Sequence, residues 1–293
     1  MLPACYNAGM NPQDTTSLAE HIAFQPWKHG RLALRNRIAM APMTRRMAPP
    51  DTGVVTKESV AYYRRRAANE VGLIIGEGTV IDSLHAYDTP TVPRIETDEQ
   101  TAGWRRVVEA VHAEGGAFAP QIWHCGRFSE NPIGPSATPV PPRPDGTPRP
   151  VPRPMEPEDF TPVLAAYAHA ARASLEMGAD ALEIHGAHGY LLDSFLSPVD
   201  NIRDDEYGGT IENRMRVPLT AVRAMREQAR GCVASSSRRA ARTASGAASR
   251  CGDRRPPSWF PAREPSVCGD PLAPPPSCGR AGVRRARGSP PRR

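Results

Sequence analysis

The stretch DALEIHGAHGY, residues 180–190, combines a short apolar strand with two histidines. His185 closes the strand predicted over 180–185, and His188 follows in the next turn of chain. In α/β folds, the residues that carry chemistry lie at the carboxyl ends of the strands. Two imidazoles at such a position could bind a metal, polarise a carbonyl group or shuttle protons, or form a hydrogen-bonded pair within a loop. A metal site would need a third ligand, and the sequence offers no suitable partner.

Three further strand-and-helix units precede this strand. Apolar runs of strand length lie at residues 37–41, 71–76 and 117–122. Apolar residues at helical spacing then predict helices over 57–69, from Thr97 to Gly115, and from Phe160 to Gly178. The second of these helices starts at the string TDEQ, which is typical of a capping box. A fourth helix is expected over 212–229, with Pro218 inside it.

Four units in this order predict an α/β domain whose parallel sheet is covered by helices. A doubly wound open sheet and a (β/α)8 barrel both fit the order, and spacing alone does not choose between them. A barrel needs eight units and about 250 residues. No fifth strand is expected after residue 230, where the chain continues as GCVASSSRRAARTASG.

Residues 231–293 differ in composition from the rest of the chain. They contain thirteen Arg, no Lys and three acidic residues, which gives a net charge of +10. Because the whole chain has a net charge of +6, residues 1–230 have a net charge of −4. The segment also lacks Ile, Met, Tyr, Asn, Gln and His, so it cannot bury enough apolar surface to offset its ordering entropy. We expect a disordered basic tail, and we interpret it as translation of a GC-rich gene in a shifted reading frame.

Several classes of protein are excluded by simpler features. The chain has no apolar run near 18 residues, so no membrane span is expected. Its first residues lack the basic and apolar regions of a secretory signal, which predicts a cytoplasmic location. Four of the six cysteines lie in the basic tail without C-x-x-C spacing, so neither a disulfide framework nor a metal site is expected.

Residues 131–157 form a segment crowded with Pro and Arg. Neither strand nor helix spacing is present in it. A loop of this length inside a compact domain is usually a functional lid or a disordered excursion.

Five strings of the sequence resemble the Old Yellow Enzyme family and its NADH:flavin oxidoreductase relatives. They occur in the family's order, with its approximate spacing. The strings are LRNRIAMAPMTR (34–45), GLIIGEGTVI (72–81), WRRVVEAVHAEGG (104–116), QIWHCGR (121–127) and ALEIHGAHGYLLDSFLSPVDNIRDDEYGGTIENRMR (181–216). The resemblance implies a partial TIM barrel of about four βα units. The expected domains are an N-terminal arm (1–31), the truncated flavin oxidoreductase barrel (32–230) and the basic tail (231–293).

This resemblance also implies a cofactor and a reaction. FMN would lie non-covalently over the carboxyl ends of the strands. NADH or NADPH would pass a hydride to the flavin, and the reduced flavin would pass it to the β-carbon of an activated alkene such as an enone. The expected partner is therefore a small-molecule alkene, without a membrane or nucleic acid.

Several positions match the family's FMN contacts. The Thr44 hydroxyl would hydrogen-bond near the flavin O4. Gly78 matches a glycine after the second strand, where the backbone approaches the ring closely, and the Gln121 amide would bond the pyrimidine edge. The positions that the resemblance assigns to FMN binding are Pro42, Met43, Thr44, Gly78, Gln121 and His185.

Substrate binding and catalysis are implied for the loop that follows 180–185. His185 and His188 would donate hydrogen bonds to the carbonyl oxygen of the alkene, where charge grows during hydride transfer. Tyr190 would protonate the α-carbon, with packing at the barrel rim as the alternative. Trp123 matches a tryptophan that faces the substrate in the family, and a packing role is equally compatible with its position.

The chain departs from the family after residue 230. The family's later strands supply an Arg beside the flavin N1–O2 edge and the loops that hold the FMN phosphate. No residues after 230 match either feature. We therefore expect weak FMN binding or none, and a catalytically inactive fragment is the alternative to an enzyme. Nucleic-acid binding through the basic tail is a third hypothesis, less favoured because the tail has few aromatic residues.

Overall fold

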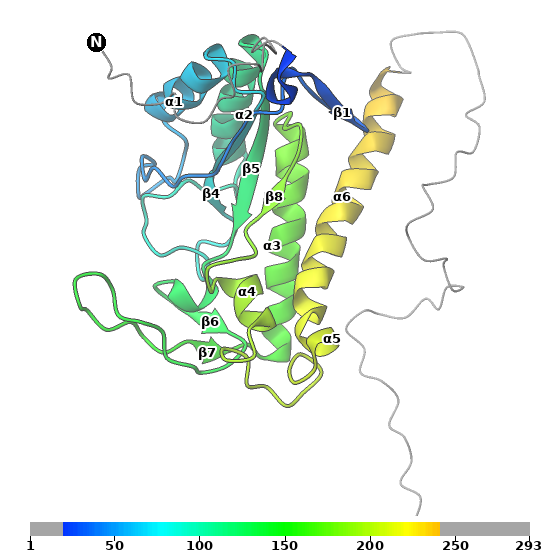
Figure 1. Ribbon diagram of the computed structural model, residues 1–293. Coiled ribbons are helices and arrows are strands. Elements are labelled where there is room, and N and C mark those ends of the chain that lie inside the picture. Colours follow the sequence, from blue (N-terminus) through cyan, green and yellow to red (C-terminus); the bar gives the residue numbers. More distant parts are fainter. Residues whose placement is uncertain (1–19, 241–293) are drawn as a thin grey trace, which may run out of the picture. The chain divides into compact units, whose positions relative to one another are not determined.

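The computed structural model describes residues 20–240, with side chains up to residue 228. Predictions for residues 1–19 and 241–293 lie outside this part. The main sheet consists of four parallel strands, in the order β3 (Ala39–Met40), β4 (Leu73–Val80), β5 (Ala117–Trp123) and β8 (Glu183–Ile184). In a barrel, strands that are consecutive in the chain lie next to one another in the sheet, whereas the strand order of a doubly wound sheet reverses at a switch point. The sheet is a curled half-barrel (Figure 1), which confirms the expected partial TIM barrel.

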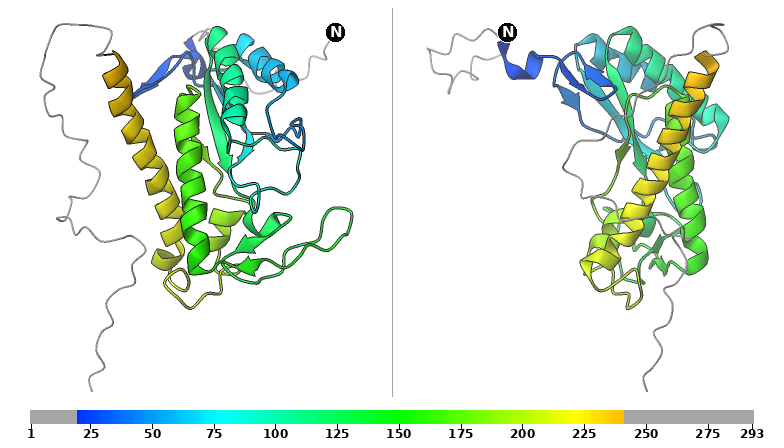
Figure 2. Two further views of the ribbon diagram at one scale, coloured as in Figure 1. Left: turned by 180° about the vertical axis from the view of Figure 1, so that it is seen from behind. Right: turned by 90° about the vertical axis from the view of Figure 1, so that its right-hand side faces the viewer.

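Four long helices flank this sheet. They are α1 (Lys57–Ala68), α2 (Asp98–Ala113), α3 (Pro157–Glu176) and α6 (Arg216–Ala240). Helix α1 packs against β4 and α2, α2 packs against β5, and α3 lies along α6 (Figure 2). Helices α1 and α2 thus each cover the strand that follows them in the chain, as in successive βα units, whereas α6 packs mainly on α3. None of the helices in the described residues is long and apolar enough to cross a membrane.

Local sequence signals explain where the helices begin and end. The predicted capping box of α2 is present: Thr97 Oγ1 accepts from the Gln100 amide, and the Gln100 side chain accepts from the Thr97 amide. Gly115 follows α2 with φ of +73°, a conformation that favours glycine. The fourth predicted helix is divided into α5 (Ile211–Arg214) and α6. Pro218 lies in the first turn of α6. Backbone N–H groups there have no acceptor within the helix, so a proline costs no hydrogen bond.

The core lies between the sheet and its helices. Tyr63 from α1, Trp104 from α2 and Phe118 from β5 are fully buried, and their ring centroids are 5.6–6.2 Å apart. Every residue of β5 is buried, as expected for a central strand that is covered on both faces. These contacts fix the strand whose end carries Gln121 and Trp123.

Some short elements were not predicted from the sequence. Strands β1 (Trp27–His29) and β2 (Leu32–Leu34) form an antiparallel hairpin with a tight turn at Gly30. Helix α4 (Leu191–Leu196) follows the two histidines. The three-residue helices η2 (Ile22–Phe24) and η3 (Gly126–Phe128) complete the set.

The Pro- and Arg-rich loop 131–157 is held together at its base. Strands β6 (Ile133–Gly134) and β7 (Arg153–Pro154) pair in parallel near its two ends. The Arg203 guanidinium donates to the Pro135 and Met155 carbonyl oxygens at 2.9 and 2.8 Å. Pairing between residues about twenty positions apart has no short-range sequence signal, which is why neither element was predicted.

Candidate active site

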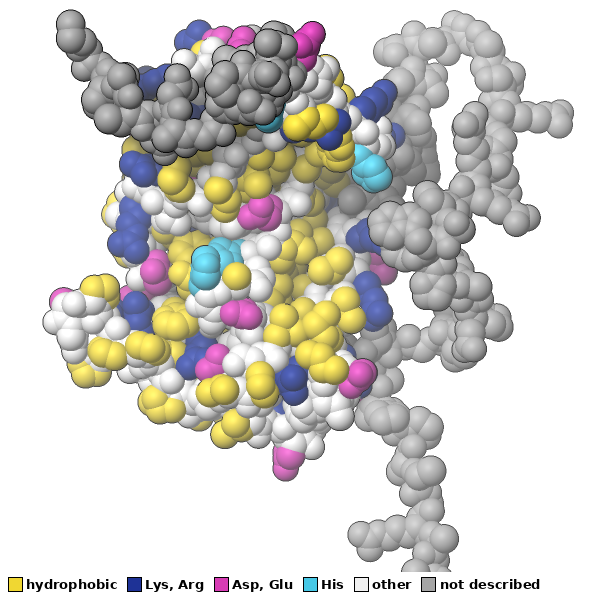
Figure 3. Space-filling view, viewed as in Figure 1, with side chains coloured by type: hydrophobic (Ala, Val, Ile, Leu, Met, Phe, Trp, Pro, Cys, Tyr) yellow, Lys and Arg dark blue, Asp and Glu magenta, His cyan; other side chains and the backbone are white. Residues whose placement is uncertain are grey.

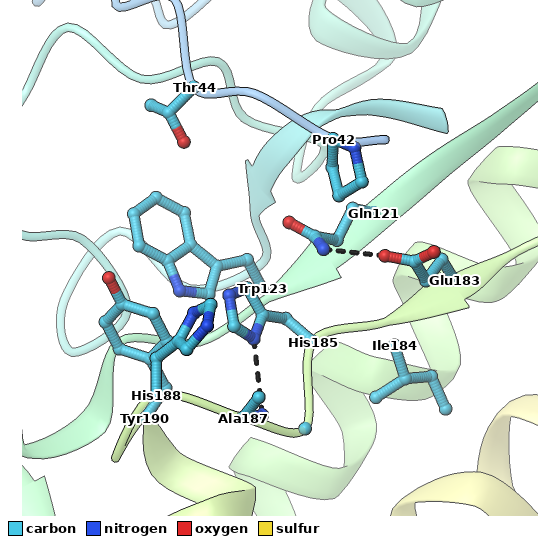
Figure 4. A pocket seen from close by; sticks show the side chains of 11 residues that line it. Pro42, Thr44, Gln121, Trp123, Glu183, Ile184, His185, Ala187, His188 and Tyr190 are labelled. Atoms are coloured by element: carbon cyan, nitrogen blue, oxygen red, sulfur yellow. Dashed lines mark hydrogen bonds between the residues drawn. The ribbon is translucent and has the colours of Figure 1, made fainter. Parts of the chain in front are cut away.

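A cavity of about 340 Å³ opens at the carboxyl ends of the strands (Figure 4). Seven of the nine residues that the sequence assigned to the site lie around it. The full lining consists of Pro42, Thr44, Gln121, Trp123, Glu183, Ile184, His185, Gly186, Ala187, His188 and Tyr190. These residues come from three separate segments of the chain, so the fold brings them together.

Two of the assigned residues lie elsewhere. Met43 is 47% exposed and is not part of the cavity lining. Gly78 lies within β4 and faces Trp123, where an added Cβ would come 2.6 Å from Cε3 of the indole. The need for glycine at this position therefore follows from close packing of Trp123. Contact of Gly78 with a flavin ring stays a prediction.

His185 and His188 approach each other through a tight turn. The His185 amide donates to the Ile122 carbonyl at 2.9 Å, so the pairing of β8 with β5 extends to His185. His188 has φ of +61° and Gly189 has φ of +74°, which turns the chain back on itself. The left-handed region is uncommon for residues other than glycine, and His is among those enriched there. The two imidazole centroids are 5.2 Å apart.

The protonation of His185 is set by its surroundings. Its Nδ1 lies 3.4 Å from the Ala187 amide, which donates to it, so the hydrogen of the neutral ring is on Nε2. Burial lowers the pKa of His185, and the neighbouring His188 lowers it further, whereas Asp193 opposes both effects. At neutral pH this imidazole is therefore a neutral hydrogen-bond donor.

Tyr190 stands edge-on to the rings around it. Its ring centroid is 4.8 Å from that of His185 and 5.1 Å from that of Trp123, with interplanar angles of 89° and 76°. Burial raises the pKa of Tyr190 to about 12, and the nearby Cys125 and Asp88 act in the same direction. The phenol therefore keeps its proton throughout the neutral and mildly alkaline range.

Gln121 and Glu183 form a hydrogen-bonded pair across adjacent strands. The two residues are in register on β5 and β8, and Gln121 Nε2 donates to Glu183 Oε1 at 2.7 Å. An ionised carboxylate only accepts, so the amide nitrogen must face it and the amide oxygen must face away. That oxygen points toward the side of the cavity that holds Thr44 and Trp123 (Figure 4). Glu183 was not predicted as a site residue, although its position two residues before His185 places both on one face of the strand.

Trp123 combines the two roles that its position allowed. Its side chain is almost completely buried against Gly78, yet it also lines the cavity. The indole stacks on His185, with a centroid separation of 6.2 Å and an interplanar angle of 23°. Replacing it would therefore change both the packing of β4 and the wall of the cavity.

The surface around the histidines is mixed in character. Figure 3 shows histidine side chains on this face with hydrophobic side chains beside them and carboxylates nearby. Apolar walls with a few convergent polar groups are typical of sites for small organic molecules. Among the described residues, no cluster of three or more His, Cys, Asp or Glu side chains could hold a metal ion.

The model of the NADH:flavin oxidoreductase / NADH oxidase family matches residues 23–243. The chain belongs to this family. The match contains all four strands of the half-barrel and the whole lining of the cavity. It confirms the resemblance to the Old Yellow Enzyme group that the five sequence strings indicated.

Relatives within the family include plant and fungal reductases. The chain is 38% identical over 229 residues to 12-oxophytodienoate reductase 7 of Oryza sativa subsp. japonica, which covers 73% of this chain and 57% of the reductase. It is 39% identical over 217 residues to the flavin oxidoreductase hxnT of Emericella nidulans, which covers 70% of this chain and 55% of that protein. The chain thus spans little more than half the length of these two relatives.

Solved structures of the same family superpose on the half-barrel. Morphinone reductase in complex with tetrahydroNAD superposes with a TM-score of 0.63 at 40% identity, over 70% of this chain and 60% of that one. The Old Yellow Enzyme homologue from Zymomonas mobilis superposes with a TM-score of 0.65 at 38% identity, over 69% of this chain and 59% of that one. Identities at this level support equivalence of the half-barrel in the family.

One buried histidine beside this cavity has no part in its lining. His124 follows β5, and its side chain is inaccessible to solvent. Its Nδ1 accepts from the Gly126 amide at 3.1 Å, whereas Nε2 has no hydrogen-bond partner and lies 3.7 Å from Asp82. Burial lowers the pKa of His124 to about 4, and the Asp82 carboxylate offsets only part of that effect.

This histidine predicts a pH dependence of stability. Because the folded pKa lies below the unfolded value of about 6.5, the unfolded chain takes up the proton first as the pH falls. The free energy of unfolding should therefore fall between pH 6.5 and 4, by about 2–3 kcal/mol more than in the variant His124→Asn. Asparagine keeps an acceptor for the Gly126 amide but does not titrate. Urea denaturation at several pH values measures the difference, and parallel pH profiles for the two proteins would contradict it.

Proposed function

We propose that this chain forms the substrate-facing half of an FMN-dependent site that transfers a hydride from NADH or NADPH to an activated alkene. The observation that carries the proposal is the convergence of His185, His188 and Tyr190 on one cavity at the carboxyl ends of the strands. Family membership and the tetrahydroNAD complex of morphinone reductase support the same class of reaction. The proposed substrate class is an enone or a similarly polarised alkene.

The residues on the other side of the cavity fit a flavin ring. Gln121 presents an amide oxygen, Thr44 a hydroxyl group, and Pro42 an apolar edge. A planar heterocycle with both N–H donors and carbonyl acceptors matches this set of groups. When bound, FMN would supply the hydride chemistry that protein side chains do not provide.

The two histidines would bind and polarise the substrate carbonyl. His185 offers its Nε2 hydrogen, and its lowered pKa keeps the ring neutral at physiological pH. His188 stands 5.2 Å away and offers a second donor from the turn. Negative charge grows on the carbonyl oxygen as hydride reaches the β-carbon, so donors placed there stabilise the transition state more than the ground state.

Tyr190 would deliver the proton that completes the reduction. Its pKa of about 12 keeps the phenol protonated at working pH. The edge-on contacts with His185 and Trp123 fix the ring, so the hydroxyl group is held at one position in the cavity. A general acid must be held within hydrogen-bond reach of the carbon that it protonates.

A second candidate is a chain of the same ancestry that does not retain FMN. In the part of the chain that the structure describes, β3 and β8 pair on one side only. The cavity is consequently formed by the four-stranded half-barrel and the loops that follow its strands.

Flavin retention tests the proposal directly. The purified chain is mixed with FMN, excess flavin is removed by gel filtration, and the visible absorbance spectrum of the protein is recorded. A retained flavin band supports the proposal. Reduction of the bound flavin by NADPH, followed by its reoxidation with an enone, would demonstrate both steps of the proposed hydride transfer. The variant Gln121→Leu serves as the matched control, because loss of one amide contact should weaken FMN binding about 5- to 10-fold. A soluble but colourless natural chain would overturn the proposal in favour of the second candidate.

A further inference from the structure

A buried carboxylate lies behind the segment that carries Pro42 and Thr44. Glu77, in β4, is 1% exposed. Its Oε2 accepts from two successive backbone amides, those of Arg45 at 2.7 Å and Arg46 at 3.3 Å. Successive backbone N–H groups that converge on one point form a concave anion-binding site. Here the bound anion is the Glu77 carboxylate of the same chain.

The backbone at this point is in an unusual conformation. Arg46 has φ of +56°, although it is not glycine, and its side chain is exposed. Such a conformation costs about 1–3 kcal/mol, so the surrounding structure must hold it. Among the described residues, the amides of Arg45 and Arg46 make the only backbone hydrogen bonds of segment 42–47. The ion pair of Arg46 with Asp88 is long, at 3.6 Å, and the Arg46 side chain is 59% exposed.

Glu77 is held firmly on its other side. The Tyr63 hydroxyl lies 3.4 Å from Glu77 Oε1 and donates to it, and it also accepts from the Glu77 amide at 2.9 Å. Tyr63 is itself fully buried in the core against Trp104 and Phe118. The carboxylate therefore connects the rigid core to a segment whose residues 43–46 have exposed side chains.

We propose that Glu77 is a positioning residue for this cavity. By holding the amides of Arg45 and Arg46, the carboxylate fixes the segment whose Pro42 and Thr44 line one side. The link to FMN rests on the proposed function, whereas the restraint on the segment does not. Removal of Glu77 should release the segment and leave the strands in place.

The test uses three variants of the full chain. Glu77→Leu removes the acceptor at similar volume, and Glu77→Gln keeps one acceptor oxygen without the charge. Thr79→Val is the matched control, because Thr79 is buried on the same strand and its hydroxyl donates to the Glu77 carbonyl without touching the segment. Hydrogen–deuterium exchange of the flavin-free protein follows the amides of 43–48 and those of β4 and β5. A parallel titration measures FMN affinity.

In Glu77→Leu, the amides of Arg45 and Arg46 should exchange about 10- to 100-fold faster, the range expected for losing hydrogen bonds to a charged group. Glu77→Gln should lie between that variant and the natural chain, and Thr79→Val should leave this segment unchanged. FMN should bind at least about 10-fold more weakly to Glu77→Leu.

Unchanged exchange over 43–48 in Glu77→Leu would overturn the proposal. An equal increase throughout β4 and β5 would also overturn it, because it would indicate a role in general stability. If Glu77→Leu does not fold, the exchange of these amides in Glu77→Gln is judged by the same two criteria. Loss of segment protection in a chain that takes up no FMN would support the positioning role and count against the proposed function alone.

Discussion

Replacement of His185 by alanine is expected to lower kcat/KM for an enone about 100- to 1,000-fold, the cost of removing one donor from a developing oxyanion. The loss should appear mainly in kcat, because the hydrogen bond from Nε2 strengthens as charge grows on the carbonyl oxygen. Steady-state oxidation of NADPH with 2-cyclohexenone as acceptor measures both constants. His185 also stacks on Trp123, so FMN retention is measured on the same preparation to show that the cavity persists.

His29→Ala is the matched control for this experiment. His29 lies exposed on the β1–β2 hairpin and is not part of the cavity lining, so the variant removes an imidazole without touching the proposed chemistry. Its kcat/KM should stay within about twofold of the natural value, because surface substitutions of this kind change little. A His185→Ala variant with more than a third of the natural kcat/KM would rule out the donor role.

The variant Trp104→Ala is expected to lower the free energy of unfolding by about 3–5 kcal/mol. Trp104 is completely buried and packs on Tyr63 and Phe118, so its removal leaves a cavity between α2 and β5. Its indole Nε1 has no hydrogen-bond partner. Loss of that unpaired group offsets part of the cost, which favours the lower end of the range.

Guanidinium denaturation followed by circular dichroism measures this change. Leu84→Ala provides the control, since Leu84 is 62% exposed and its truncation should change stability by less than about 0.5 kcal/mol. Trp104→Phe should recover a large part of the loss because the aromatic contact with Phe118 is retained. A change below 1 kcal/mol in Trp104→Ala would show that the core does not depend on this side chain.

Much of the fold could be predicted because its signals are local. The capping box at Thr97 and Gln100 and the glycine after α2 act within one turn of helix, so they are present in the sequence itself. The hairpin at Gly30 was not predicted because its strands are three residues each, too short for apolar and polar residues to show an alternating pattern. The pairing of β6 with β7 was missed because it joins distant residues.

The candidate site was predicted through family motifs more than through spacing. Residues alone left the roles of His185 and His188 open, and the resemblance supplied the neighbours Gln121 and Trp123. Glu183 and Glu77 were not assigned, since a single acidic residue in an apolar strand does not show which backbone or amide groups will face it. Their partners lie on other strands and loops.

The sequence by itself determined the family, the order of the four parallel strands and the long helices, and most of the polar residues that line the cavity. It did so because helix caps, apolar periodicity and motif spacing are properties of neighbouring residues. Only the tertiary structure decided that Gly78 accommodates Trp123, that Glu183 orients the Gln121 amide, and that Glu77 holds a left-handed Arg46. Each of these depends on atoms that approach from an adjacent strand or from the loop beside it, and the physical reason for each residue exists only once the sheet has formed.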